Sequence, residues 1–250
     1  MESQFGNATL YSSFAGLATL VGVYLVLKRE AWSRRGSIYL VSFASGSLLS
    51  AALLDILPES LELNENASLY VLLSFLAFYI LEQNVVMHAS HENVECCPGD
   101  ERHRRHSLGM ISFLGIGFHS LLDGVIIGAG FLDNPATGLI ATIGVIGHEL
   151  PEGLSIMGVL FHAGFPRRRA LIYSAIVALA TPVGTVLSYK LLRNVGTDFL
   201  GTLLGVAAGS FLYIAASDLI PETRRESSPY NVPLVIGGML ALFILKLLLK

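Results

Sequence analysis

Long apolar stretches alternate with short polar segments along the whole chain. Eight stretches reach the length of about 20 mostly apolar residues that a membrane-spanning helix needs. They are residues 8–27, 37–57, 67–88, 108–132, 137–162, 170–192, 199–220 and 232–249. Backbone groups in lipid must bond within the chain, and these stretches lack the alternation of a membrane β-barrel. We therefore predict an all-α membrane protein with eight transmembrane helices, packed as a single domain over residues 1–250.

The composition agrees with a lipid environment. Of the 250 residues, 53% are hydrophobic and only 14% are charged, and the mean hydropathy is +0.63. A soluble domain needs more polar surface than this. No basic tract is long enough to indicate a nucleic-acid partner. The two cysteines, Cys96 and Cys97, are neighbours, which excludes a disulfide framework.

Basic residues concentrate in alternate connecting segments. If the N-terminus lies outside, the inside segments hold Lys28, Arg29, Arg34, Arg35, Arg102, Arg104, Arg105, Arg167, Arg168, Arg169, Arg224 and Arg225. The outside segments then hold only Lys190, Arg193, Lys246 and Lys250. Because cytoplasmic segments of membrane proteins carry the excess of Lys and Arg, we predict that both termini lie on the non-cytoplasmic side. We expect the plasma membrane to house the protein.

A gapless repeat relates the second stretch to the seventh. The string Gly46-Ser47 … Asp55-x-x-Pro58-Glu59 recurs as Gly209-Ser210 … Asp218-x-x-Pro221-Glu222. From Gly46 to Gly209, and from Asp55 to Asp218, the offset is 163 residues. The two stretches cross the membrane in opposite directions, and inverted repeats are typical of transporters that alternate access around a central site. We predict a 3+2+3 inverted-repeat bundle, with the fourth and fifth stretches between two related triplets.

The predicted topology places the repeated carboxylates at opposite membrane faces. Asp55 and Glu59 would lie at the outer mouth, and Asp218 and Glu222 at the inner mouth. Each pair is four residues apart and would share one helix face. We interpret the pairs as the entrance and the exit for a cation. The alternative is that Asp-x-x-Pro-Glu simply ends an apolar helix at the interface.

The fourth and fifth stretches carry polar residues near mid-span. The fourth holds His119 and Asp123, and the fifth holds His148, Glu149 and Glu152. A charge there costs about 2.5–3.5 kcal/mol on insertion scales, and neither stretch contains Lys or Arg to neutralise the acids. Positions i and i+4 share a helix face, whereas Glu149 lies about 100° from His148. The missing counter-charge would be a bound dication; the alternative is an internal hydrogen-bond network, for example His119 with Glu152.

The donor set indicates which metals would bind. Imidazole combined with carboxylate suits Zn²⁺, Fe²⁺ and Mn²⁺. The absence of thiolate argues against a tight structural zinc site or a copper(I) site. Mixed ligands on mobile helices suit a site that must also release its metal, so we predict a divalent cation as a transported substrate, and the affinity order favours Zn²⁺ over Fe²⁺ and Mn²⁺.

The two motifs resemble a known family. His119-x-x-x-Asp123-Gly124 and His148-Glu149-x-Pro151-Glu152-Gly153 are similar to the fourth- and fifth-helix motifs of the ZIP (Zrt-/Irt-like protein) metal transporters, nearest to the GufA-like and bacterial branches. The resemblance implies a transport site of His119, Asp123, His148, Glu149 and Glu152. It implies import of Zn²⁺, and sometimes Fe²⁺, Mn²⁺ or Cd²⁺, into the cytoplasm. It also implies a homodimer in which one bundle rocks or slides against another.

Two positions depart from the family's pattern. Many relatives have Asn where this chain has Ser120, and Glu where it has Thr181, just before Pro182. In relatives with two metals both positions help to bind the second ion. We therefore expect Ser120 and Thr181 to mark at most a weak secondary metal site, in which Glu149 and Glu152 could bridge.

A polar segment at about residues 89–107 interrupts the apolar pattern, and we predict a cytoplasmic loop there. His88, His91, His103 and His106 are candidates to capture metal on exit. The alternative is a solvated linker without a binding role. Cys96 and Cys97 are too close together for a standard zinc knuckle.

Two other functions compete with transport. His148-Glu149-x-x-Glu152 superficially resembles the H-E-x-x-H motif of zinc hydrolases, which would suggest an intramembrane hydrolase. However, position 152 is Glu, Pro151 interrupts the helix, and no substrate-binding domain is visible. A metal-sensing receptor is the second alternative, but a sensor needs only one access route. We predict a transporter and not an enzyme.

Overall fold

The computed structural model describes residues 2–91, 99–133, 135–191, 196–226 and 228–248. Within these ranges the secondary structure is entirely helical, as predicted. The helices are α1 (Glu2–Lys28), α2 (Glu30–Arg35), α3 (Ser37–Ser50), η1 (Ala51–Ile56), α4 (Leu57–Leu63), α5 (Ala67–His91), α6 (Gly99–Asp133), α7 (Pro135–His162), α8 (Arg167–Leu191), α9 (Thr197–Tyr213), η2 (Ile214–Leu219), α10 (Ile220–Arg225) and α11 (Asn231–Leu248).

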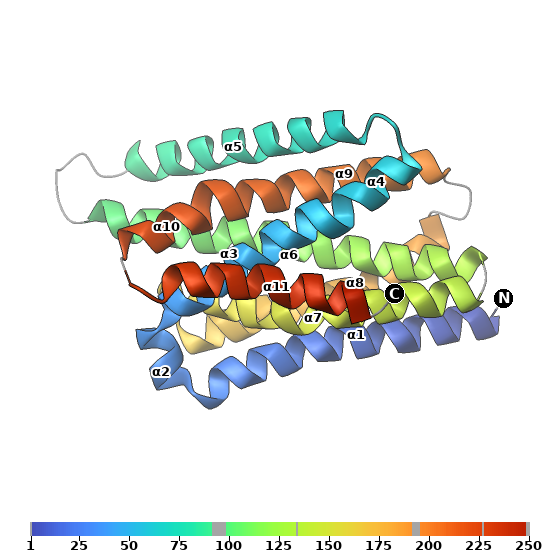
Figure 1. Ribbon diagram of the computed structural model, residues 1–250, viewed down its shortest axis with the longest axis horizontal. Coiled ribbons are helices and arrows are strands. Elements are labelled where there is room, and N and C mark those ends of the chain that lie inside the picture. The colour runs from blue at the N-terminus through green and yellow to red at the C-terminus, as the bar shows by residue number, and fades with distance from the viewer. Residues whose placement is uncertain (1, 92–98, 134, 192–195, 227, 249–250) are drawn as a thin grey trace.

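The long helices lie side by side and alternate in direction (Figure 1). α1 starts and α11 ends at the same end of the bundle, which we call the terminal end. The segments that join α1 to α3, α7 to α8 and α10 to α11 lie at the opposite end, which we call the far end. All the predicted apolar stretches fall on helices wherever the structure describes them.

Length and composition agree with a membrane protein. Five helical segments among the described residues are long and apolar enough to cross a membrane, namely Gln4–Lys28, Ser37–Leu63, Arg105–Leu132, Arg167–Tyr189 and Asp198–Arg225. Ala67–Gln83 and Asn231–Ile244 are shorter apolar helices, and α7 carries acidic and histidine residues in its middle. The number of eight spans therefore stays a prediction.

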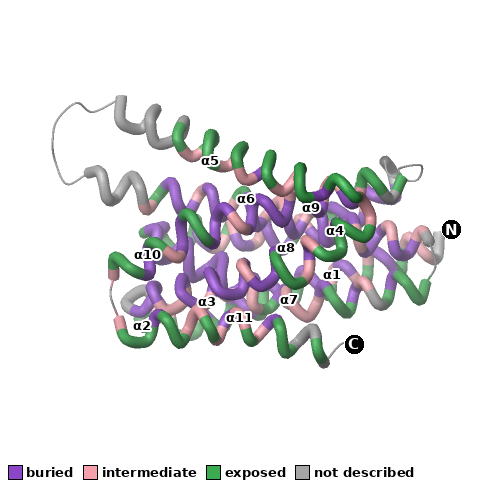
Figure 2. Tube along the Cα trace, turned by 45° about the horizontal axis from the view of Figure 1, so that its top comes forward, coloured by how far each residue is buried: buried purple, intermediate pink, exposed green. Residues whose placement is uncertain are grey.

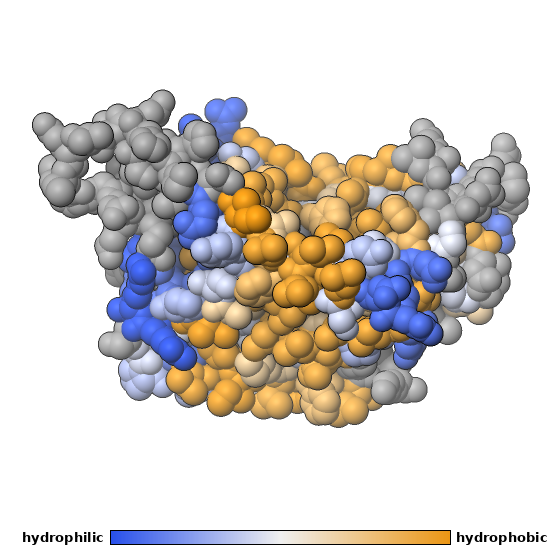
Figure 3. Space-filling model, turned by 90° about the horizontal axis from the view of Figure 1, so that it is seen from above, coloured by the Kyte–Doolittle hydropathy of each residue, from blue (hydrophilic) through white to orange (hydrophobic). Residues whose placement is uncertain are grey.

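The surface matches this assignment. Large apolar side chains such as Leu72 and Leu179 are more than half exposed, and α5 is exposed along most of its described length (Figure 2). On the face shown in Figure 3, apolar residues fill the middle and hydrophilic residues gather toward both ends. Such an apolar belt would promote aggregation in water, but it matches the hydrocarbon layer of a bilayer.

The helices form two packed sets. α1, α6, α7 and α8 contact one another, whereas α3 packs on α11 and α5 packs on α9; α3 with α7, and α6 with α9, join the sets. Within the first set the backbones approach very closely. A Cβ atom at Gly124 would clash with the carbonyl oxygen of Thr181, and one at Gly153 would clash with that of Thr19. Small residues allow this approach in membrane bundles, and here it brings α6 and α7 against α8 and α1.

Two short π-helical segments interrupt the long helices. η1 lies between α3 and α4, and η2 lies between α9 and α10. Each is six residues long, and Pro58 or Pro221 stands in the first turn of the α-helix that follows it. A π segment has hydrogen bonds between residues i and i+5, which makes it wider than an α-helix, and it is often found at functional sites. Asp55 lies in η1 and Asp218 lies in η2.

The predicted loop at about residues 89–107 is too long, and this prediction is corrected. α5 continues to His91, and α6 begins at Gly99 and runs without a break into its apolar part. Charged residues end an apolar span but do not end a helix, because Arg, Glu and Lys are good helix formers in water. Residues 92–98, including Cys96 and Cys97, lie outside the described residues.

Candidate metal centre

The mid-span polar residues come together between α6 and α7, and we call them the core cluster: His119, Asp123, His148, Glu149 and Glu152. His119 and Asp123 lie one turn apart on α6, and the other three lie on α7. All of them are buried except His148, whose side chain is 19% exposed. Gly124 and Gly153 have no Cβ atom that would clash with the neighbouring backbones, so α6 and α7 can pack deep within the first helix set.

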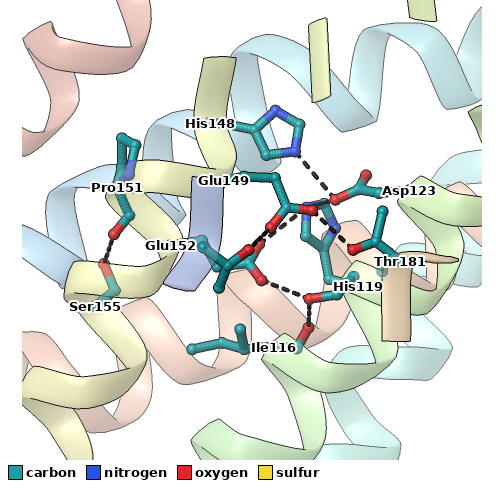
Figure 4. Close-up of polar contacts among 12 residues, drawn as sticks. Ile116, His119, Asp123, His148, Glu149, Pro151, Glu152, Ser155 and Thr181 are labelled. Carbon is teal, nitrogen blue, oxygen red and sulfur yellow. Dashed lines mark hydrogen bonds and ion pairs between the residues drawn. The ribbon is translucent and has the colours of Figure 1, made fainter. Parts of the chain in front are cut away.

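Three donor atoms converge on one point. The Nε2 atoms of His119 and His148 each lie 3.1 Å from the same oxygen, Oδ2 of Asp123. Figure 4 shows the two imidazoles and this carboxylate pointing toward one another. Two ligands at about 2.0–2.1 Å from a tetrahedral zinc ion are about 3.3 Å apart. The separations observed therefore fit ligands of a single ion.

His119 is not explained by hydrogen bonding among the described residues. Both of its ring nitrogens are buried and neither makes a hydrogen bond there, although Nε2 is 3.1 Å from Asp123 and 3.9 Å from an oxygen of Glu152. Its ring also packs on Phe211 of α9, at 4.2 Å between centroids. A buried polar atom without a partner costs about 1–3 kcal/mol. The pair named in the predicted alternative, His119 with Glu152, is too far apart for a hydrogen bond, at 3.9 Å.

Glu149 and Glu152 are held by hydroxyl groups. Thr181 donates a hydrogen bond of 2.8 Å to Oε1 of Glu149, and Thr19 of α1 donates to its other oxygen. Ser120 donates to Glu152 and, in an alternative geometry of the same hydroxyl, to the carbonyl oxygen of Ile116 at 3.0 Å. Figure 4 shows Glu149 directed toward Thr181. Ser120 and Thr181, predicted as possible secondary ligands, thus lie beside the carboxylates.

Thr19 is a residue that the sequence interpretation missed. A signal for it exists, because Ala18-Thr19-Leu20-Val21-Gly22 of α1 matches Ala180-Thr181-Pro182-Val183-Gly184 of α8 in four of five positions. The two threonines take equivalent places. The carbonyl of Thr19 contacts Gly153 of α7, as the carbonyl of Thr181 contacts Gly124 of α6. Both hydroxyls then reach Glu149.

The core cluster has a large charge imbalance. It contains three carboxylates, and no Lys or Arg occurs between Arg105 and Arg167 in the sequence. Isolated buried carboxylates are very costly unless a cation or proton compensates them. The arrangement can therefore take up a divalent cation, with imidazole and carboxylate as ligands and hydroxyls that orient the remaining acids.

The predicted mouth carboxylates lie outside the core cluster and differ from each other. At the terminal end Asp55 is half-buried and Glu59 is exposed. At the far end Asp218 and Glu222 are both buried, and Glu222 is completely so. Equivalent positions of the repeat thus have different surroundings, since Glu222 contacts His162 and Arg105 whereas Glu59 is exposed.

The predicted histidines of the polar segment are only partly described. His106 lies on α6, where it is exposed and its ring stacks on Phe165 at 4.3 Å. The side chains of His88, His91 and His103 lie outside the described part of the structure. Their role in metal capture stays a prediction.

Comparison with known proteins identifies the family. A family model described as ZIP Zinc transporter matches residues 6–107 and 88–248. The chain belongs to the ZIP family. The zinc transporter ZupT of Chlorobium chlorochromatii is 27% identical over 245 residues, covering 91% of this chain and 90% of that protein. The zinc transporter ZIP4 of Rattus norvegicus is 34% identical over 169 residues, 63% of this chain but 25% of that protein.

A third relative has a similar reach. The zinc transporter YKE4 of Saccharomyces cerevisiae is 25% identical over 215 residues, which cover 76% of this chain and 62% of that protein. This chain therefore spans nearly all of ZupT and a quarter of ZIP4. Membership in the ZIP family, predicted from the two motifs, is confirmed. It makes the chain a divalent metal transporter and not an enzyme, and neither the hydrolase nor the receptor interpretation is favoured.

Proposed function

We propose that this chain carries Zn²⁺ across the membrane into the cytoplasm, and that the ion binds between α6 and α7. The observation that carries the proposal is the convergence of His119, Asp123 and His148 on one point. Their donor atoms lie within 4.8 Å of one another, in a buried region that lacks Lys and Arg. Two imidazoles with a carboxylate and an open fourth position form a donor set that zinc favours.

Glu152 is the proposed fourth ligand. Its Oε2 atom is 3.9 Å from Nε2 of His119, so a rotation of its side chain would bring it to an ion shared with that nitrogen. Glu149 is the fifth proposed ligand, and it would have to leave the hydroxyls of Thr19 and Thr181 to reach the same ion. A second ion at Ser120 and Thr181 would compete with hydrogen bonds that already use these hydroxyls, which agrees with a weak secondary site at most.

The same donor set also accepts Fe²⁺, Mn²⁺ and Cd²⁺ as candidate substrates. The affinity of a site of this kind rises from Mn²⁺ through Fe²⁺ to Zn²⁺. We propose Zn²⁺ as the main substrate because of this order and because the relatives that match are zinc transporters by name.

Alternating access within a 3+2+3 inverted repeat is the proposed mechanism. The repeat predicted from sequence is supported by η1 and η2, since Ala51–Ile56 and Ile214–Leu219 differ by the same 163 residues as the motif. Packing also agrees. A Cβ at Gly46 of α3 would clash with the carbonyl of Val235 in α11, and a Cβ at Gly209 of α9 would clash with that of Val71 in α5.

We propose that the far end faces the cytoplasm of the host cell and that both termini lie outside the plasma membrane. The described far-end segments carry Arg29, Arg167 and Arg225, in agreement with the positive-inside rule. Metal would then enter past Asp55 and Glu59 and leave past Asp218 and Glu222. A homodimer is also proposed, on the basis of the family resemblance.

The test is Zn²⁺ uptake into proteoliposomes that contain a trapped zinc-sensitive dye. Wild-type protein is compared with His148→Ala/Glu152→Ala, and with Arg167→Gln as a control, because Arg167 pairs with Glu30 at the far end and belongs to none of the proposed metal-binding groups. We expect uptake by the wild type and the control, and none by the double variant. Equal uptake by all three would reject transport through the core cluster.

A further inference from the structure

A second group of metal-ligand side chains lies at the far end, and we call it the far-end cluster: Arg105, His162, Glu222 and Glu226. Nε2 of His162 lies 2.9 Å from Oε1 of Glu222. Nε of Arg105 lies 3.7 Å from the same oxygen, and Nη2 of Arg105 lies 2.8 Å from Oε1 of Glu226. Ser37 contacts the other ring nitrogen of His162 at 3.2 Å.

The far-end cluster joins both helix sets. Arg105 is on α6 and His162 is the last residue of α7, so both belong to the first set. Glu222 lies in the first turn of α10 and Glu226 directly follows that helix, while Ser37 is the first residue of α3 in the second set, on which α10 packs. The side chains of His162 and Glu222 are 1% and 0% exposed, so this contact between the sets excludes water.

Three side chains of the far-end cluster could hold a metal ion. One donor atom from each of His162, Glu222 and Glu226 lies within 4.8 Å of the others, as in the core cluster. Unlike the core cluster, this group has its own cation in the guanidinium of Arg105. That cation pairs closely with Glu226 but lies farther from Glu222, and its Nε atom is buried without a hydrogen bond among the described residues.

We propose that His162, Glu222 and Glu226 form a second divalent-metal site whose resting occupant is the guanidinium of Arg105. A metal ion that arrives from the core cluster displaces Arg105 and takes the two carboxylates and the imidazole. Since Arg105 then loses both anionic partners, α6 is released from α10 and the far end can open. When the metal leaves, the ion pairs form again and close this end. The inference rests on the proposed transport function, and it adds Arg105, His162 and Glu226 to the residues that act in it.

The first experiment separates this site from the core cluster. The full chain with His119→Ala/His148→Ala is purified in detergent and titrated with Co²⁺, whose absorption bands report the ligands. We expect one Co²⁺ ion per chain, lost when His162→Ala is added. Because Glu226 is partly exposed, Glu226→Gln is a second variant that keeps the test valid if His162→Ala fails to fold. Absence of Co²⁺ binding in the His119→Ala/His148→Ala variant would overturn the proposal.

The competition by Arg105 is tested in the same background. Arg105→Gln removes the internal cation and should tighten Co²⁺ binding by about two- to fivefold, the order expected when a partly exposed ion pair is lost. Arg167→Gln is the matched control, because Arg167 also forms an ion pair at the far end, with Glu30 at 3.1 Å, but touches none of these ligands. Equal affinity in Arg105→Gln and Arg167→Gln would contradict the competition.

Uptake assays then separate the far-end metal site from the transport function. In proteoliposomes, Arg105→Gln should change the rate of Zn²⁺ uptake by several-fold, whereas Arg167→Gln should match the wild type. If the wild type transports zinc and both arginine variants match it, the far-end proposal is wrong and the transport function stands. If the wild type does not transport zinc while the Co²⁺ site at the far end is present, the transport function is wrong and the metal site stands.

Discussion

The core cluster and the far-end cluster use the same ligand chemistry but balance their charge differently. The core cluster has three carboxylates and no basic residue in the surrounding sequence, whereas the far-end cluster has Arg105 within 2.8 Å of a carboxylate. A site without its own cation gains most from binding an external one. A site with an internal cation must exchange it, so it binds more weakly and releases faster. On the proposed transport route, this difference would place tight binding at the core cluster and release at the far-end cluster.

The largest expected effect separates the two clusters directly. Asp123→Asn removes the carboxylate that both core imidazoles share at 3.1 Å, and it should weaken Zn²⁺ binding by about 100-fold or more. Glu226→Gln at the far end should leave binding at the core unchanged. Isothermal titration of both variants measures this, and a similar loss of core affinity in the two would break the comparison.

Lower pH should weaken binding at both clusters. Imidazole and carboxylate must be deprotonated to bind metal, so the apparent affinity falls by up to about tenfold per pH unit for each proton displaced. The complex with Zn²⁺ is therefore stable at higher pH and dissociates as the pH falls. Zn²⁺ uptake measured in a pH series checks the direction, and faster uptake at acid pH would contradict it.

The next effect concerns the close packing that carries the core cluster. Gly124→Ala introduces a clash with the backbone of Thr181, so it should lower the free energy of unfolding by about 1–3 kcal/mol and reduce metal affinity. Gly144→Ala is the control on α7, because no atom lies within 4 Å of a Cβ placed there. Thermal melting in detergent compares them. Equal melting temperatures would mean that the close approach of α6 and α8 is not required.

The smallest expected effect concerns Thr19 and Thr181. Each donates a hydrogen bond to Glu149, so Thr19→Val and Thr181→Val should each change zinc affinity by about tenfold or less. The two variants should act in the same direction because the threonines occupy equivalent positions on α1 and α8. Opposite effects on the dissociation constant would show that the two residues act differently.

The fold and the core cluster were largely predictable from the sequence. The length of the apolar stretches predicted the helices, and the i, i+4 spacing of His119 and Asp123 predicted that they share a face. Thr19 was missed because a threonine in an apolar helix has no distinctive signal by itself. Only its match to the Thr181 segment reveals it.

Other features depend on neighbours that the sequence does not specify. Glu59 and Glu222 occupy equivalent positions in the repeat. Glu222 is nevertheless buried against His162 and Arg105, while Glu59 is exposed. His162 lies far from Glu222 along the chain, so only the folded bundle brings them together. The helical start of α6 was missed for a different reason, since charge marks the edge of the lipid and not the end of a helix.

The lack of basic residues around the core cluster also links folding to metal supply. A ligand that binds only the folded state stabilises it by about 2.7 kcal/mol when its free concentration is a hundred times its dissociation constant. If Zn²⁺ binds the three buried carboxylates of the core cluster only in the folded state, the empty protein is the less stable species, and zinc-starved cells would hold a transporter that unfolds and is degraded more readily. A melting temperature that rises with added Zn²⁺, and does not rise in Asp123→Asn, would demonstrate this linkage. The cargo would then serve as the protein's own stabilising ligand.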